Sequence, residues 1–188
     1  MSDPLAFLEK RASAIALREP GPPPELVERI VRAALRAPDH GALRPFRILL
    51  FEGPGRERLA RAFVASAQRQ NPKADPFLLE KERQKAFRAP LVFVVASTPR
   101  PHPKVPEIEQ VLSAGCVAYG ILLGLQAAGF GGMWRTGAPA YDPELKRELG
   151  LAPSDAIVGF IYAGTPEGFT PSTHRPTPES HLIRITTP

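Results

Sequence analysis

The run VLSAGCVAYGILLGLQAAGF at residues 111–130 decides the fold class, because it holds twenty residues without a formal charge. That length is close to the length of a membrane span. Polar side chains interrupt the run, however, and its many glycines and alanines would let another helix approach closely. We therefore predict a long central helix over Glu107–Gly129 that is buried on all sides, and we set the membrane-spanning alternative aside.

Strand and helix signals alternate on both sides of this helix. The apolar, β-branched run Leu91–Ser97 is typical of a strand covered on both faces. Asp142, Pro143 and Gly150 have the right chemistry for the cap, first turn and stop of a short helix. Further strands are expected at Phe46–Phe51, Gly131–Arg135 and Ala156–Ala163, and further helices at Asp3–Arg11, Glu25–Ala37, Arg56–Gln70 and Phe77–Phe87. This pattern predicts a single α+β domain over residues 1–188 with three or four strands among five or six helices.

The last part of the chain differs in composition from the rest. Residues 166–188 are rich in Pro, Thr and Ser, and only Leu182–Ile185 is strand-like. Such a tail cannot bury much surface alone, so we expect it to extend from the domain and to wrap a partner subunit.

Composition and charge limit the function further. The 188 residues include 24 basic and 19 acidic ones, and the net charge of +5 favours anionic ligands. The single cysteine, Cys116, excludes a disulfide framework, and we interpret it as a small core residue. The four histidines show no metal-ligand spacing, so we expect no metal site. The residues Met1–Lys10 do not resemble a targeting signal, and we expect a cytoplasmic protein.

Phosphate-binding motifs of the common kinds are missing. Gly53-Pro54-Gly55 follows a strand, but the third glycine of a dinucleotide fingerprint is absent. Basic residues on the helices at 56–70 and 77–87 are interleaved with acidic ones, which is typical of a solvated surface. We therefore expect no nucleic acid, although a non-enzymatic basic nucleic-acid-binding domain remains a rival interpretation.

Four stretches of the chain together carry a family resemblance. They are Lys10-Arg11-Ala12-Ser13, residues 36–40 (RAPDH), residues 129–137 (GFGGMWRTG) and residues 157–166 (IVGFIYAGTP). With them the sequence, from about residue 5 to 170, resembles the nitroreductase family of flavin mononucleotide (FMN) enzymes, and above all its compact branch of NAD(P)H nitroreductases. The resemblance implies a mainly antiparallel sheet flanked by helices, a homodimer with the long helix at its interface, and two FMN sites at that interface.

The resemblance also implies which residues hold the FMN phosphate. The family carries an Arg-Arg-Ser triplet at the end of its first helix, and this chain has Lys10, Arg11 and Ala12 there. Arginine offers phosphate a planar fork of donors, and lysine adds a point charge. Ser13 stands one place late, so either an inserted residue shifts it or its hydroxyl contact is lost.

Further FMN contacts are implied on three other segments. Arg36 and His40 are expected to contact FMN. The alternatives are that the Arg36 cation only stabilises a helix C-terminus and that His40 is an ordinary loop residue. Backbone at Gly131 and Gly132 can approach the flat ring and donate an N–H to it. The remaining implied FMN contacts are Trp134, Arg135 and Thr136.

Two segments are implied more weakly. The family associates the stretch Gly124, Leu125, Gln126, Ala127, Ala128 and Gly129 with NAD(P), but helix packing explains its glycines equally well. His102 and Lys104 face either a substrate pocket or solvent.

The implied activity is that of an FMN-dependent oxidoreductase. NAD(P)H reduces the flavin and leaves, and a nitroaromatic, a quinone or a related acceptor then binds in its place, which is a ping-pong scheme. The cofactor carries the chemistry, so we assign no catalytic residue of the protein. Flavin reduction, dehydrogenation and reductive dehalogenation on the same fold are the alternatives.

Overall fold

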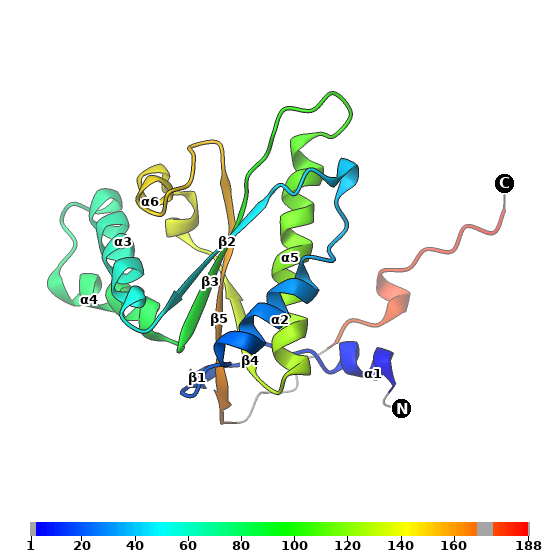
Figure 1. Cartoon of the computed structure of the whole chain (residues 1–188), viewed down its shortest axis with the longest axis horizontal. Helices are drawn as coiled ribbons and strands as arrows, with labels where there is room; N and C mark the ends of the chain where they lie inside the picture. The colour runs from blue at the N-terminus through cyan, green and yellow to red at the C-terminus, as the bar shows by residue number, and fades with distance from the viewer. Residues whose placement is uncertain (1–2, 169–174, 188) are drawn as a thin grey trace.

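The computed structural model describes residues 3–168 and 175–187 and shows three layers, with an antiparallel sheet between two layers of helices (Figure 1). Helices α3, α4 and α6 cover one face of the sheet, and α2 and α5 cover the other. The elements in chain order are α1 (Pro4–Glu9), β1 (Ala16–Arg18), α2 (Pro24–Ala34), β2 (Phe46–Glu52), α3 (Gly55–Gln70), α4 (Pro76–Gln84), β3 (Leu91–Ser97), α5 (Glu107–Ala127), β4 (Gly131–Arg135), α6 (Pro143–Glu148) and β5 (Ala156–Glu167). The predicted α+β class is confirmed.

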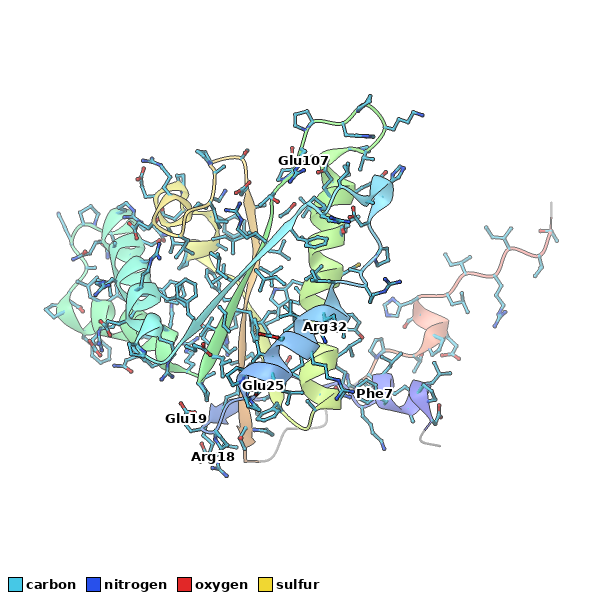
Figure 2. All side chains as sticks on the ribbon, viewed as in Figure 1. Phe7, Arg18, Glu19, Glu25, Arg32 and Glu107 are labelled. Atoms are coloured by element: carbon cyan, nitrogen blue, oxygen red, sulfur yellow. The ribbon has the colours of Figure 1, made fainter. Side chains whose placement is uncertain are left out.

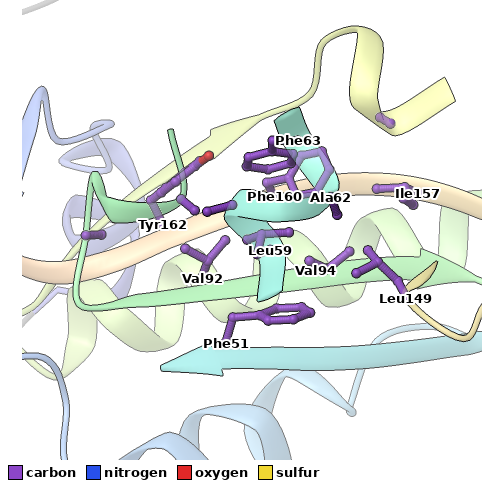
Figure 3. Packing of buried hydrophobic residues seen from close by; sticks show 14 of the residues in the cluster. Phe51, Leu59, Ala62, Phe63, Val92, Val94, Leu149, Ile157, Phe160 and Tyr162 are labelled. Carbon is purple, nitrogen blue, oxygen red and sulfur yellow. The ribbon is translucent and has the colours of Figure 1, made fainter. Parts of the chain in front are cut away.

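Strand β5 is the centre of the sheet. It pairs with β1, β3 and β4, and β3 in turn pairs with β2, always antiparallel. All seven residues of β3 are buried, as its continuous apolar sequence predicts. Because side chains alternate across a strand, Val92 and Val94 join the core under α3, and Phe93 and Val95 join the core under α5. Figure 3 shows the first of these cores, with Tyr162 at one end of it.

Helix α5 contacts α2 closely because two of its glycines lack a side chain. A Cβ added at Gly120 would lie 2.9 Å from Ala34 Cα, and one added at Gly124 would lie 2.8 Å from Ile30 Cγ2. The expectation that small residues allow close helix packing is therefore confirmed.

The prediction that α5 is buried on all sides is wrong for the single chain. Ile108, Leu112 and Tyr119 are 62%, 61% and 44% exposed, and Cys116, which we expected in the core, is exposed among them. These residues recur at helical spacing, so they form one apolar stripe opposite the sheet. By length and hydropathy α5 is the one described helix that also matches a membrane span, a test that core helices of soluble proteins pass as well.

Three elements differ most from the sequence expectations. Helix α2 ends at Ala34 instead of Ala37, because Arg36 and Ala37 continue only as a turn with i→i−3 hydrogen bonds. The three-residue strand β1 was not expected, and it forms because β5 runs on to Glu167 and pairs with it. The strand expected at Leu182–Ile185 is wrong, since this exposed segment has no neighbouring strand among the described residues. Residues 169–174 and 188 of the tail lie outside the described residues.

Asp142 fastens α6 to α3, in addition to its predicted role as a helix cap. Its carboxylate accepts from the backbone N–H groups of Glu144 and Leu145. Arg69 of α3 donates to the same carboxylate through Nε and Nη2, at 3.1 and 2.7 Å. Burial alone raises the pKa of Asp142, but the hydrogen bonds from Ser66, Arg69 and the α6 backbone outweigh it and hold this pKa below its ordinary value.

Replacing Asp142 by alanine should therefore lower the free energy of unfolding at pH 7 by roughly 2–3 kcal/mol, through loss of the cap and of the partner of Arg69. A carboxyl group whose pKa is lower in the folded than in the unfolded state stabilises the fold fully at pH values above the unfolded pKa, which is about 3.8. This contribution is lost as the pH falls through the pKa of the folded state. Urea titrations should show the full difference from wild type at pH 7 and a smaller one at pH 3. Glu148→Ala removes the more exposed partner of Arg69 and should cost at most about 1 kcal/mol; equal losses for both variants would contradict this account.

Candidate functional site

A cavity of about 380 Å³ lies where the N-terminal segment meets the end of α5 and the start of β4, and we call it the Arg11 cavity. Lys10 and Arg11 contribute two cations to it, and none of the ion pairs formed by the described residues involves either of them. Lys10, Arg11, Ala12, Ala14, Leu122, Gln126, Phe130, Gly131, Gly132 and Pro166 line it.

Two hydrogen bonds hold the N-terminal segment at this cavity. The Gln126 amide donates to the Phe7 carbonyl oxygen at 2.7 Å, and Figure 2 shows Phe7 beside the end of α5. The Ala14 N–H donates to the Gly132 carbonyl oxygen at 3.1 Å. A Cβ at Gly131 would lie 2.7 Å from Leu17 Cδ2, and one at Gly132 would lie 2.7 Å from Leu122 Cδ2. The two glycines are thus needed for this close approach.

Two further residues lie near the Arg11 cavity without lining it: Arg175, which the sequence did not suggest, and Ser13, which it did. Arg175, from the described part of the tail, donates through Nη2 to the Arg11 carbonyl oxygen at 2.7 Å. It is one of two arginines in a tail rich in Pro and Thr, and the sequence does not distinguish it from Arg184. Ser13 is exposed and does not line the Arg11 cavity, although its neighbours Ala12 and Ala14 do.

The pleat of β4 divides the predicted residues between the two faces of the sheet. The Trp134 indole packs over Gly159, where an added Cβ would lie 2.1 Å from its Nε1, and it donates to the Val158 carbonyl oxygen at 3.1 Å. Arg135 points to the opposite face, where its Nε donates to Met133 Sδ at 3.1 Å. The Gly132 carbonyl points away from β5, toward the edge of β4 that is not paired with β5. In an antiparallel strand every second residue directs its backbone N–H and C=O to the same edge. The N–H and C=O of Trp134 therefore also lie on this open edge of β4.

A larger cavity of about 630 Å³ lies on the α3 face, next to β4, and we call it the Tyr162 cavity. Burial raises the pKa of Tyr162 to about 12, against the opposing effect of Arg88 and Arg135, so its hydroxyl stays protonated at neutral pH. The lining combines apolar residues with three cations and one carboxylate: Phe63, Ala67, Gln70, Asn71, Leu78, Glu82, Lys85, Arg88, Trp134, Arg135, Thr136, Gly137, Ala138, Pro139, Phe160 and Tyr162.

Arg36 and His40 line neither cavity of their own chain. Arg36 is exposed after the end of α2. His40 Nδ1 lies 2.7 Å from a carboxylate oxygen of Glu109 on α5. The loop between them is held in place, because Ser113 Oγ donates to the Pro38 carbonyl oxygen at 2.8 Å.

The remaining predicted residues are divided between packing and solvent. Leu125 is fully buried and Gly124 lies against Ile30, so helix packing explains both. Of this stretch only Gln126 lines the Arg11 cavity. His102 and Lys104 are exposed and line neither cavity.

Comparison with known proteins identifies the family. The model of the nitroreductase family matches residues 9–165. The chain belongs to the nitroreductase family. It is 39% identical over 165 residues to the Escherichia coli K12 protein named "Putative NAD(P)H nitroreductase YdjA", covering 88% of this chain and 89% of that one. A Haemophilus influenzae protein named "Putative NAD(P)H nitroreductase" is 35% identical over 164 residues, covering 87% and 88%.

Solved structures show the nitroreductase fold independently. A nitroreductase-like protein from Bacillus cereus superposes with a TM-score of 0.84 at 19% identity, covering 100% of this chain and 98% of that one. A structure from Desulfovibrio desulfuricans, described as a putative nitroreductase in complex with FMN, has a TM-score of 0.74 at 20% identity and covers each chain fully. At these identities the likeness establishes the nitroreductase fold alone.

Proposed function

We propose that this member of the nitroreductase family is an FMN-dependent oxidoreductase that uses NAD(P)H to reduce nitroaromatic, quinone or related acceptors. One observation carries the proposal: the Arg11 cavity places two cations that lack anionic partners among the described residues next to β4, whose edge away from β5 is open at Trp134. The two cations suit a phosphate, and the open strand edge can donate a backbone hydrogen bond to a flat ring. The curated relatives named for NAD(P)H, and the relative solved with FMN, support it.

Each part of the chain has a distinct task in this proposal. Lys10 and Arg11 bind the phosphate, and Gln126 and Phe130 complete the lining of the cavity beside them. The open edge of β4 offers the Trp134 N–H to the ring. FMN, when bound, supplies the hydride chemistry, so the protein needs to bind and orient and no side chain needs to act as an acid or a nucleophile.

The visible spectrum of the purified protein tests this function. We expect a yellow protein, or a colourless one that turns yellow with added FMN, that bleaches under NADH or NADPH without oxygen and recovers its colour with a nitroaromatic or quinone. Oxidised product without NAD(P)H consumption would favour dehydrogenation instead. A protein that never takes up FMN and is retained on DNA in a salt-sensitive way would support the nucleic-acid rival.

The proposal includes a cytoplasmic homodimer in which the apolar stripe of α5 packs against a second copy. Exposed apolar stripes of this kind are typical of interfaces. Arg36 and His40 lie outside both cavities of their own chain, so we propose that they contact FMN held mainly by the other copy. The exposed tail residues Leu182, Ile183 and Ile185 would then cover apolar surface of the partner.

Replacing Leu112 by glutamate should convert the dimer into a monomer, because it places a charge in the middle of the apolar stripe. Light scattering should give twice the chain mass of 20.4 kDa for wild type and one chain mass for the variant. Phe77→Glu is the matched control, since Phe77 is also apolar and exposed but lies on α4. A wild-type protein that is monomeric with FMN bound would refute the dimer.

A further inference from the structure

The Tyr162 cavity holds two guanidinium groups that have no anionic partner among the described residues. Lys85, the third cation of the lining, lies 2.5 Å from both carboxylate oxygens of Glu82 and is therefore neutralised. None of the ion pairs formed by the described residues includes Arg88 or Arg135. The cavity thus has a local excess of two positive charges, which attracts an anion.

Backbone structure brings these groups together from two sides. Arg135 points onto the α3 face because β4 alternates, and Met133, on the same face of β4, is the register partner of Tyr162. Arg88 follows the helical turn Lys85–Phe87, which continues α4. Tyr162 is only 2% exposed, and no hydrogen bond to its hydroxyl forms within the described part of the chain. A protonated hydroxyl is therefore available as a third donor beside the two guanidinium groups.

The rest of the cavity suits a flat apolar group. Phe63 and Phe160 pack edge to face, with ring centroids 5.1 Å apart, but each is only 2% exposed, so the accessible apolar surface comes from the partly exposed Ala67 and Leu78. The volume of about 630 Å³ lies in the usual range for small-molecule sites. A ring against these side chains removes apolar surface from water without leaving a buried polar group unpaired.

We propose that the Tyr162 cavity binds a small aromatic carboxylate, with its carboxylate at Arg88, Arg135 and Tyr162 and its ring against Ala67 and Leu78. Carboxylate matches the planar fork of arginine, and one bound anion offsets most of the excess charge. This inference rests on the proposed function, and it narrows the acceptor to anionic aromatic compounds. The cavity adjoins the open edge of β4, so a molecule bound there lies beside the position proposed for the FMN ring.

Calorimetric binding of 4-nitrobenzoate and 4-nitrobenzyl alcohol, without NAD(P)H, tests the proposal. The two probes share ring and nitro group and differ in charge. We expect the FMN-saturated protein to bind the carboxylate roughly tenfold more tightly, as one charge-assisted hydrogen bond predicts. Arg88→Gln should reduce this preference to about twofold or less, and Arg88→Lys, which keeps the charge without the fork, should retain part of it. Arg61→Gln, an exposed arginine of α3 outside the Tyr162 cavity, should leave the preference unchanged.

Three other results would overturn the inference. Equal affinities for the two probes would show that the cavity does not select charge. The same loss with Arg61→Gln would show a general effect of net charge. A loss of FMN affinity in Arg88→Gln would assign the Tyr162 cavity to the cofactor itself. Failure of the wild-type protein to bind FMN would instead refute the proposed function, and the same titrations of the FMN-free protein would still decide whether the cavity selects the carboxylate.

Discussion

A valine in place of Gly120 should lower the free energy of unfolding by about 3 kcal/mol, the upper range for overpacking a close contact. Even a Cβ at this position would lie 2.9 Å from Ala34 Cα, which is backbone and cannot rotate away. The variant must therefore push α2 away from α5. Thermal or urea unfolding followed by circular dichroism measures the loss.

Gly55→Ala is the control for this prediction. Gly55 begins α3, and nothing lies within 4 Å of a Cβ added there. Alanine has the higher helix propensity, so this variant should be neutral or more stable by a few tenths of a kcal/mol. Unchanged stability of the Gly120 variant would mean that the two helices separate at little cost, against the packing described above.

Replacing Arg11 by alanine should weaken FMN binding about 10- to 150-fold, because a charge-assisted hydrogen bond to a phosphate contributes about 1.5–3 kcal/mol. Recovery of flavin fluorescence on dilution of the FMN-loaded protein gives the dissociation constant directly. The effect should decrease as salt is added, since Arg11 is only partly buried.

Arg29→Ala removes the same charge from an exposed position on α2, outside both cavities, and should leave the FMN affinity unchanged. A similar FMN affinity for wild type and Arg11→Ala would remove Arg11 from the proposed phosphate site. Arg11 and Lys10 would then be ordinary solvated residues at the end of α1.

The elements that were predicted well carry local signals. Strand β3 has the predicted bounds because six consecutive apolar positions, all buried, lead to its one polar residue, Ser97, at which it ends. The cap at Asp142 was also predicted, since an acceptor before proline marks a helix start. Strand β1 has no such signal: three residues form a strand only because distant residues of β5 pair with them.

The exposed stripe of α5 was missed for a related reason. The helix is apolar all round, so its sequence does not distinguish the face against the sheet from the face left open by the single chain. Periodicity finds a buried face only where a polar face contrasts with it.

The candidate site was predicted in pieces. Lys10, Arg11 and Gly132 do meet in one cavity, as the family resemblance implies. Trp134 and Arg135 are neighbours in the motif, but strand alternation places their side chains on opposite faces of the sheet. Which side chain lies on which face depends on the register of β4 against β5, and the motif does not show that register. Arg88 was hidden in a charged segment and Tyr162 in an apolar strand, and only the fold shows that they share a cavity.

The large separation in sequence between β1 and β5 also governs how the protein is made. Leu17 pairs with Pro166, and within residues 3–168 and 175–187 β4 has no sheet neighbour other than β5. During synthesis β1 therefore stays unpaired until β5 has left the ribosome. Such sequence-distant pairing slows folding, so the newly made chain exposes its apolar β3 and α5 segments for longer than a helical bundle of this size would.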